Sequence, residues 1–353
     1  MRSTTCAATI PHYPFPISLP RTARRVSSDR KDVTGAPLVL ALVLAVCAAM
    51  PATHAEPFRA GEKIEFEAPG VGGGTQRIFG QLVLPEGRHG AVPAMVVVPG
   101  SPGVTDAREG HYVRAFVRAG IAAFVIDSLT PRGVLATPDD QGRLSDAQVL
   151  ADAYAALELL AARREIDRRR IGILGAGKGG NVALLAMDRH GAGSGPHASS
   201  KSFAVSVALY PSCAVQYRNP RPAVPLLLLL AGADDYTGVE PCRRYAARLR
   251  DAGGSVELIV YPGAPHGFDG DERFRGLQAF RRAQNVSSCL VHIEDDGRFT
   301  LAPTGVPLEN ARQYLDVLSR NCMTRGASIG TDPVAKRKSL GDILSFVARR
   351  LLD

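Results

Sequence analysis

The 353-residue sequence has no low-complexity tract, no internal repeat and no apolar run long enough to span a bilayer comfortably. It also lacks a Cys-x-x-Cys pair, so the spacing of its cysteines gives no support for a metal site. Hydrophobic residues make up 45% of the chain and charged residues 22%. This balance, together with those absences, indicates an ordinary globular protein.

The first 55 residues differ in composition from the rest of the chain. An apolar run covers residues 38–50, and the small residues Thr53 and Ala55 follow at the positions that a signal peptidase recognises. This order predicts a signal peptide over residues 1–55 and an exported protein, periplasmic or secreted, with a single domain over 56–353. A membrane anchor is the alternative, and the long basic segment also fits translation that begins downstream of Met1. The basic residues before the run are Arg2, Arg21, Arg24, Arg25, Arg30 and Lys31.

The net charge gives no sign of a nucleic-acid partner. The formal charge of the whole chain is +8. The predicted signal peptide has six basic and two acidic residues, so it carries +4 of this total and leaves +4 for the rest. That remainder is spread thinly, whereas nucleic-acid binding proteins concentrate basic residues in a patch.

Four of the six cysteines lie beyond residue 55, at positions 213, 242, 289 and 322. In an exported domain this number suggests two disulfides, for which three pairings are possible. We favour Cys213–Cys242 and Cys289–Cys322, because the first two each follow a predicted strand and can meet at one sheet edge. Four separate buried thiols are the alternative.

Short apolar segments alternate with longer amphipathic ones along the rest of the chain. The apolar segments fit strands buried on both faces, and the alternation predicts an α/β domain with a mostly parallel sheet. Polarity alternates instead at residues 64–67 and 77–84, as in half-exposed antiparallel strands. The buried strands are expected at residues 94–98, 122–126, 171–174, 204–209, 226–230 and 256–261.

Helices are expected between these strands. Ser145 and Gln148 form a capping-box pattern that opens a helix running to residue 162. A second helix is expected at 181–190 with Gly191 as its C-terminal cap, and a third at 242–254. The last segment carries one apolar stripe at helical spacing, typical of a core face. This stripe consists of Leu340, Ile343, Leu344, Val347 and Leu351.

The glycine-rich stretch "IGILGAGKGGN" at residues 171–181 fits three different motifs. A phosphate-binding P-loop is excluded because Lys178 is followed by Gly179, where a hydroxyl should hold Mg²⁺. A dinucleotide-binding turn needs an acidic residue about 20 positions further on, and the only acid between residues 181 and 230, Asp188, comes too early. The third possibility is the G-x-S-x-G nucleophile elbow, with Gly177 in place of the central Ser or Cys.

Residues elsewhere in the chain support the elbow. In α/β-hydrolases the nucleophile, the acid and the histidine follow successive strands in that order. Asp234 directly follows one predicted strand, and His266 lies in the loop after the next. Such a carboxylate orients the imidazole, which then serves as a general base. Separately, each residue could be an ordinary turn or surface residue, but their order and placement together favour a catalytic pair.

Five segments, in this order and spacing, resemble the dienelactone hydrolase family of α/β-hydrolases over nearly all of the chain beyond the signal peptide. The resemblance implies an α/β-hydrolase fold, with a mostly parallel twisted sheet, helices on both faces and antiparallel strands at the N-terminal edge. It also implies hydrolysis of a small ester or lactone through an acyl-enzyme, without metal or organic cofactor. The segments are "PAMVVVPGSPGV", "AAFVIDSLTPRGV", "DAYAALELLAARREIDRRRIGILGAGKGG", "ADDYTGVEPC" and "YPGAPHGFD".

The same resemblance assigns roles to individual residues. Asp234 matches the family's acid and His266 its base. The backbone N–H groups of Ser101 and Lys178 match the two oxyanion-hole donors. Relatives carry Cys or Ser where this chain has Gly177, and a covalent mechanism needs such an attacking atom. A milder departure is Pro99-Gly100, where relatives usually have His-Gly.

The sequence therefore leaves two main hypotheses about function. One is an ester or lactone hydrolase whose activity is weak, lost or rewired. The other is a non-catalytic pseudoenzyme that binds a small acyl or lactone ligand or a partner protein. A rewired enzyme could use a relocated serine (Ser101, Ser206 or Ser212) or a water activated by His266. A nucleotide binder is the third and weakest class.

Two further residues follow strand ends, where open α/β sheets bind ligands. Arg132 and Tyr236 are therefore candidates for the lining of the binding pocket. The alternative for both is an exposed position in a loop.

Overall fold

The computed structural model describes residues 58–353, except 71–73, 88, 194–200, 274 and 309–310. The predicted signal peptide lies outside the described residues, so it stays a prediction. None of the helices in the described part of the chain combines the length and apolarity needed to cross a bilayer.

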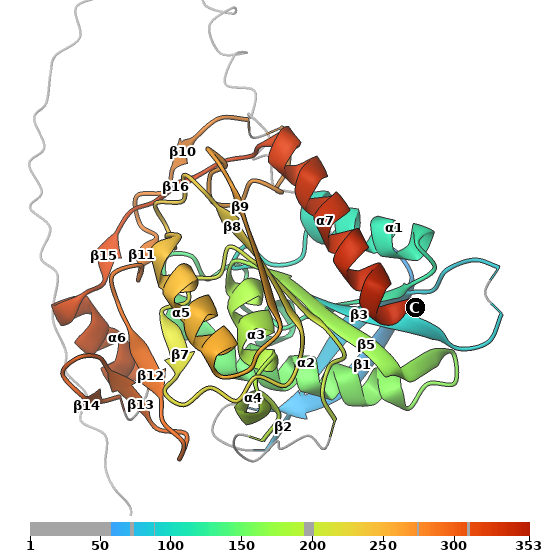
Figure 1. Cartoon of the computed structure of the whole chain (residues 1–353), viewed down its shortest axis with the longest axis horizontal. Coiled ribbons are helices and arrows are strands. Elements are labelled where there is room, and N and C mark those ends of the chain that lie inside the picture. The colour runs from blue at the N-terminus through green and yellow to red at the C-terminus, as the bar shows by residue number, and fades with distance from the viewer. Residues whose placement is uncertain (1–57, 71–73, 88, 194–200, 274, 309–310) are drawn as a thin grey trace, which may run out of the picture. The chain divides into compact units, whose positions relative to one another are not determined.

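An eight-stranded sheet forms the centre of the described domain, in the order β1-β2-β4-β3-β5-β6-β8-β9 (Figure 1). Neighbours from β4 to β9 are parallel, whereas β2 is antiparallel to both β1 and β4. The predicted mixed sheet with an antiparallel N-terminal edge is thus confirmed. Its strands are β1 (Glu62–Pro69), β2 (Thr75–Val83), β3 (Val92–Val98), β4 (Ala122–Asp127), β5 (Ile166–Ala176), β6 (Ser206–Leu209), β8 (Leu226–Ala231) and β9 (Val256–Tyr261).

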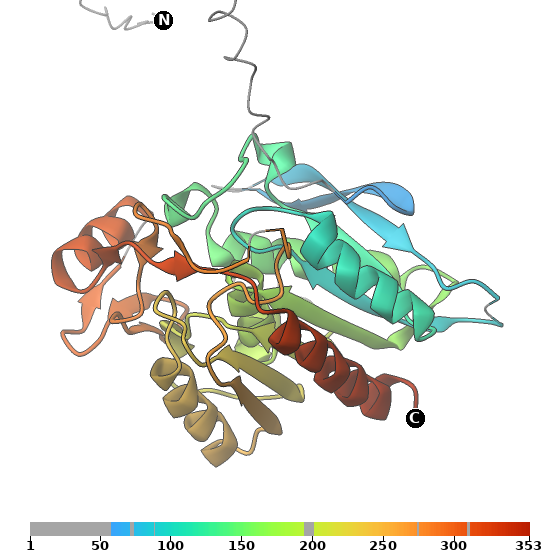
Figure 2. The same ribbon diagram turned by 90° about the horizontal axis from the view of Figure 1, so that it is seen from above.

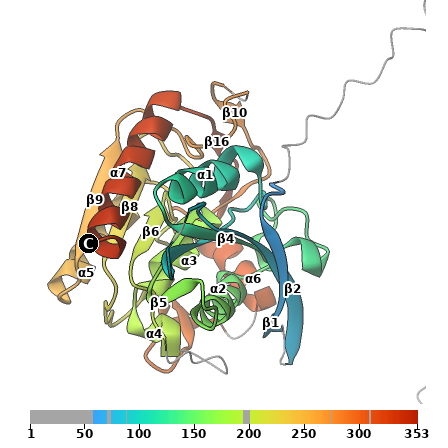
Figure 3. The ribbon, with the colours of Figure 1, turned by 90° about the vertical axis from the view of Figure 1, so that its right-hand side faces the viewer.

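Helices cover both faces of this sheet because alternate side chains of the central strands point to opposite sides. In β3, Val96 and Val98 join the apolar cluster formed with α2, α3 and α5. Met95 and Val97 join the cluster formed with α1 and α7. Figure 3 shows α1 and α7 on one side of the sheet and α2 and α3 on the other. The helices are α1 (His111–Arg118), α2 (Asp146–Ala161), α3 (Lys178–Ala186), α5 (Glu240–Asp251) and α7 (Pro333–Leu351).

The helix predictions are confirmed with one correction. The capping box at Ser145 and Gln148 opens α2, and the apolar stripe of the last segment packs α7 against the core. The helix expected at 181–190 is wrong in its bounds. It begins at Lys178, ends at Ala186 and is followed by the short α4 (Arg189–Gly193). It is interrupted because the Asp188 carboxylate accepts hydrogen bonds from the backbone N–H groups of His190 and Arg221.

An insertion between β9 and α7, which the sequence patterns did not predict, lies beside β7 and α5 (Figures 1 and 2). It has a small apolar cluster of its own, which includes Val291, Leu301 and Leu318. A four-stranded sheet in the order β14-β13-β12-β7 ties it to the main domain. Its elements are β10 (Gln278–Ala279), β11 (Gln284–Asn285), β12 (Val291–Ile293), β13 (Phe299–Leu301), β14 (Val306–Pro307), α6 (Ala311–Asn321), β15 (Thr324–Arg325) and β16 (Ser328–Ile329), and its partner is β7 (Val215–Tyr217).

Both predicted disulfides are confirmed. Cys213, just beyond β6, is bonded to Cys242 in α5, with the Cα atoms 5.1 Å apart. Cys289 and Cys322 are bonded within the insertion, with a Cα separation of 5.2 Å. The first bond ties a loop at the sheet edge to a covering helix, and the second closes the insertion on itself.

Candidate active site

A sharp turn joins the end of β5 to the start of α3. Gly177 forms this turn with φ 57° and ψ −114°. Its N–H donates to the carbonyl of Leu209 on the neighbouring strand at 3.0 Å, and its carbonyl accepts from the Asn181 N–H at 2.9 Å. Because both backbone groups are bonded, the glycine is held in a conformation that other residues rarely adopt.

The glycines around the turn are there for close packing of the backbone. A Cβ on Gly175 would lie 2.1 Å from the Gly179 carbonyl oxygen, and a Cβ on Gly179 would lie 2.3 Å from that of Val98. On Gly180 it would lie 2.5 Å from the Leu209 oxygen. These contacts explain the repeated glycines without a nucleotide ligand. They also show that the strand, turn and helix are packed too tightly for side chains at these positions.

Gly177 itself meets no such obstacle. Among the described residues, and apart from its chain neighbours, the atoms nearest to a Cβ at this position would be His266 Nε2 at 3.6 Å and Tyr210 Cε2 at 3.7 Å. These are ordinary van der Waals distances. Only the positive φ, therefore, disfavours a side chain here.

The structure brings Asp234 and His266 together from two neighbouring strands. Asp234 follows β8 and His266 lies in the loop after β9. His266 Nδ1 is 2.8 Å from Asp234 Oδ2. This contact leaves Nε2 as the ring nitrogen that faces Gly177. The imidazole contacts the rings of Tyr210 and Tyr236 in edge-to-face geometry, with centroids 4.7 and 4.8 Å away.

The carboxylate of Asp234 is strongly held as an anion. Its Oδ1 accepts the backbone N–H groups of Tyr236 and Thr237, and its Oδ2 also accepts the Thr237 hydroxyl at 2.7 Å. Burial opposes ionisation, but the charge and hydrogen bond of His266 and the donors of Thr237 outweigh it and lower the pKa of Asp234 to about 2. Such an anion can orient the imidazole and stabilise its protonated form.

The two residues expected to flank the oxyanion share a partner that sequence patterns did not reveal. Gln141, in η3 (Gln141–Arg143), accepts from Lys178 Nζ at 3.2 Å and donates to Ser101 Oγ at 3.2 Å and to the Tyr236 hydroxyl at 3.3 Å. Lys178 Nζ also pairs with Asp146 at 2.9 Å. The side chains next to the turn are thus engaged with each other. The backbone N–H groups of Ser101 and Lys178 donate no hydrogen bond to another described residue.

Three serines are candidates for a relocated nucleophile. The hydroxyl of each one is hydrogen-bonded to a group other than His266. The Ser101 hydroxyl contacts Gln141. Ser206, fully buried, donates to the Ala183 carbonyl at 2.7 Å. Ser212 is bonded to the Asn181 side chain at 3.3 Å. Within the described residues none of them contacts the imidazole, so this geometry gives a relocated serine no support.

A buried charged network anchors the loop that carries His266. Asp269 is fully buried and accepts hydrogen bonds from the hydroxyls of Tyr112, at 2.6 Å, and Tyr210. Arg108 Nε lies 3.3 Å from the same carboxylate. Burial alone would raise the pKa of Asp269, but Arg108 and the two tyrosines lower it. Tyr210, with φ 35°, therefore links this carboxylate to the His266 ring.

The two candidates for a pocket lining have different outcomes. Tyr236 lies against His266, as expected for a residue near the site. Arg132 does not line the site, and it is not an exposed loop residue either. It forms a two-pronged ion pair with the buried Asp152 at 2.8 and 2.9 Å and also donates to the Ser128 carbonyl. Its charge compensates that of Asp152, because a buried carboxylate requires a partner.

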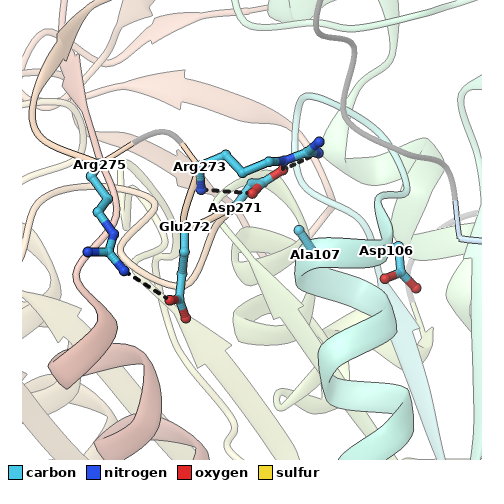
Figure 4. Close-up of a pocket in the computed structure, with 6 residues that line it drawn as sticks. All are labelled: Asp106, Ala107, Asp271, Glu272, Arg273 and Arg275. Atoms are coloured by element: carbon cyan, nitrogen blue, oxygen red, sulfur yellow. Dashed lines mark hydrogen bonds and ion pairs between the residues drawn. The ribbon is translucent and has the colours of Figure 1, made fainter.

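A depression of about 410 Å³ lies between the start of η1 (Asp106–Gly110) and the loop after Asp269 (Figure 4), and neither Asp234 nor His266 lines it. Figure 4 shows Arg273 paired with Asp271 and Arg275 facing Glu272. Because its charged groups are paired, we do not assign it as the reactive site. The described residues include no cluster of three or more His, Cys, Asp or Glu side chains suited to a metal ion.

Comparison with known proteins places the chain in a family. Residues 78–289, more than half of the chain, match the model of the dienelactone hydrolase family. A Bradyrhizobium protein named a probable 2-oxo-3-(5-oxofuran-2-ylidene)propanoate lactonase is 27% identical over 58% of this chain and 84% of its own length. A Methylorubrum extorquens protein provisionally named a carboxymethylenebutenolidase is 32% identical over 37% of this chain and 45% of its own.

The native structure of the thermophilic esterase Est2 of Thermogutta terrifontis has 17% sequence identity and a TM-score of 0.47, with 60% of this chain and 85% of the esterase covered. The family match, in contrast, extends from β2 through the site loops and into the insertion. This chain belongs to the dienelactone hydrolase family.

Proposed function

We propose that this protein descends from hydrolases of small esters or lactones and keeps their acid and base, Asp234 and His266, without the nucleophile. Gly177 occupies the nucleophile position, and the backbone N–H groups of Ser101 and Lys178 serve as oxyanion donors. Without an attacking side chain, acyl-enzyme chemistry is not available, so turnover of ordinary esters is weak or absent. No metal or organic cofactor takes part.

One observation carries this proposal: a Cβ at position 177 would lie 3.6 Å from His266 Nε2. A serine oxygen is one further bond, about 1.5 Å, from that point. It could therefore come within hydrogen-bond distance of the imidazole, as a nucleophile and its base require. Asp234 on the opposite side of the ring supports the same assignment. Substrates of the ester or lactone class follow from the family and from the lactonase relative.

A non-catalytic role is the second candidate, and Gly177 itself favours it. A protein that keeps the site but not the attacking atom can hold a small acyl or lactone ligand, or a partner protein, without converting it. Such a pseudoenzyme would bind its ligand and show no turnover under any condition.

Restoration of the nucleophile tests the proposal. Gly177→Ser and Gly177→Cys are expected to gain at least about 10²-fold in p-nitrophenyl acetate turnover, since the loss of a nucleophile costs far more than this. Gly177→Ala is the matched control, because it adds the Cβ without an attacking atom. The double variant Gly177→Ser/His266→Gln should lose the gain. Folded serine and cysteine variants that stay at the level of the alanine variant would refute the assignment of the elbow.

We also propose that the protein is exported. The two disulfides support this, because such bonds persist in oxidising compartments. N-terminal sequencing of the protein from a periplasmic or secreted fraction should find a chain that starts near residue 56. An unprocessed chain in the cytoplasm with free thiols would contradict export.

A further inference from the structure

The Cβ position of Gly177 is open, and a second reaction inferred from it rests on the proposed function. The neighbouring glycines have no such space, because their Cβ positions lie 2.1 to 2.5 Å from backbone atoms. At Gly177 the nearest atoms to the Cβ position are 3.6 and 3.7 Å away. The turn also keeps the positive φ of an elbow, held by hydrogen bonds from Gly177 to Leu209 and from Asn181 to Gly177. The turn therefore leaves the first side-chain position of residue 177 open.

A base borders this space. His266 Nε2 and Cε1 lie 3.6 and 3.9 Å from the Cβ position. Nδ1 contacts Asp234, and Nε2 has no hydrogen-bond partner among the described residues. The side chain of His266 remains 11% exposed, so small solutes in water can reach the ring. An acceptor for one proton thus faces the side of Gly177 on which the side chain of a serine would begin.

We propose that this site transfers the acyl group of a small ester to a small external nucleophile, in one displacement and without an acyl-enzyme. Suitable molecules are those that match the missing CH₂OH group, such as methanol or hydroxylamine. The molecule lies beside Gly177 with its ionisable O–H or N–H directed at His266 Nε2. It takes the place that a serine hydroxyl would have in a covalent enzyme.

The chemistry of this step balances without a further reactant. As the nucleophile attacks the ester carbonyl carbon, His266 Nε2 takes its proton, and Asp234 stabilises the imidazolium. The C–O bond to the leaving alcohol then breaks, and the imidazolium returns the proton to that oxygen. An ester and methanol give a methyl ester and an alcohol, while hydroxylamine gives a hydroxamic acid and an alcohol.

The experiment uses the unchanged protein with p-nitrophenyl acetate and increasing hydroxylamine or methanol. We expect a saturable, enzyme-dependent release of p-nitrophenol above the reaction in free solution. Mass spectrometry should find acetohydroxamic acid or methyl acetate, and no acetylated protein. His266→Gln should lower the added rate by about 10²-fold, the usual contribution of a general base. Larger nucleophiles such as 2-propanol should give no increase.

Two glycine variants distinguish the effect of filling the Cβ position of residue 177 from the effect of strain at a positive φ. Gly177→Ala puts a methyl group at this position and should abolish the increase in p-nitrophenol release that hydroxylamine causes. Gly253→Ala is the matched control, because Gly253 also has a positive φ, of 86°, with nothing within 4 Å of its Cβ position. It should leave the effect unchanged. An effect that persists in Gly177→Ala or in His266→Gln would overturn the inference.

Failure of this inference is distinguishable from failure of the proposed function. If Gly177→Ser gains esterase turnover but the unchanged protein shows no response to small nucleophiles, the inference is wrong and the elbow assignment stands. If neither protein responds, both are wrong. Detection of acetylated protein during the response of the unchanged protein would also overturn the inference, since an acetylated protein is a covalent intermediate.

Discussion

His266 Nε2 stands 3.6 Å from the point that a Cβ of residue 177 would occupy, and no backbone atom blocks that point in the described structure. The elbow therefore accepts a side chain sterically and resists it only through its backbone conformation. A substitution at position 177 should therefore lower the free energy of unfolding less than a substitution at the glycines around it.

Alanine substitutions should reveal this difference in stability. Gly177→Ala is expected to lower the free energy of unfolding by about 1 to 2 kcal/mol, the cost of a positive φ for a residue with a Cβ. Gly179→Ala should cost considerably more, because its Cβ would lie 2.3 Å from the carbonyl oxygen of Val98. Urea unfolding of both variants measures the difference. Equal losses would mean that the space at Gly177 is not as open as the structure indicates.

The anion of Asp234 should contribute stability that depends on pH. Its pKa is about 2 in the folded protein and 3.8 ordinarily, so its contribution is complete above pH 4 and is lost as the pH falls towards 2. The difference in pKa corresponds to about 2 kcal/mol. Asp234→Asn should therefore be less stable than the unchanged protein at pH 6, and the gap should narrow at pH 2 to 3.

A second aspartate provides the control for this measurement. Asp127 also accepts two backbone N–H groups, from Leu129 and Thr130, but has no imidazole partner in the described structure. Asp127→Asn removes a carboxylate from a similar turn and so separates loss of the turn from loss of the ion pair. Parallel chemical denaturation of the two variants across pH 2 to 7 makes the comparison. A gap for Asp234→Asn that does not change with pH would contradict the argument.

Asp269 should be the most costly charged residue to replace near the site. Asp269→Asn leaves Arg108 as a buried cation without its counter-charge, which typically costs about 3 to 5 kcal/mol. The exposed pair of Asp106 and Arg114 is the control, and Asp106→Asn should cost less than about 1 kcal/mol. Thermal and urea unfolding measure both. Similar small losses would show that the buried network contributes little to stability.

The disulfide of the insertion should stabilise the site loops as well as the insertion. Closure of a loop over 33 residues contributes roughly 3 to 4 kcal/mol in the chain-entropy description. The insertion also donates a hydrogen bond from the Gly330 N–H to the His266 carbonyl at 3.0 Å. Replacement of Cys289 and Cys322 by serine should lower the melting temperature and speed proteolysis within the insertion.

The second disulfide gives a matched comparison for that variant. Cys213 and Cys242 close a loop of similar length, 29 residues, but lie outside the insertion. Their replacement should destabilise the domain by a similar amount without selective cleavage in the insertion. Limited proteolysis with mapping of the fragments by mass spectrometry tells the two apart. Identical fragment patterns for both variants would refute the local role of Cys289–Cys322.

The sequence by itself determined the elements whose signals are local. Runs of apolar residues predicted the buried strands, the pattern of Ser145 and Gln148 predicted the start of α2, and the position of the cysteines favoured the correct pairing. Asp234 and His266 could be singled out because each follows a strand, and the carboxyl ends of parallel strands meet at one edge of the sheet. In each case a few neighbouring residues carry the information.

Only the tertiary structure decided which side chains meet across long separations in the chain. Gln141 joins Ser101, Lys178 and Tyr236, yet nothing near it in the sequence marks it out. Arg132 follows a strand like a ligand-binding residue, but Asp152 in α2 holds it in a buried ion pair. The insertion packs through short strands whose partners are distant in sequence. Such contacts depend on how the elements pack against each other, and short patterns of residue type do not encode that arrangement.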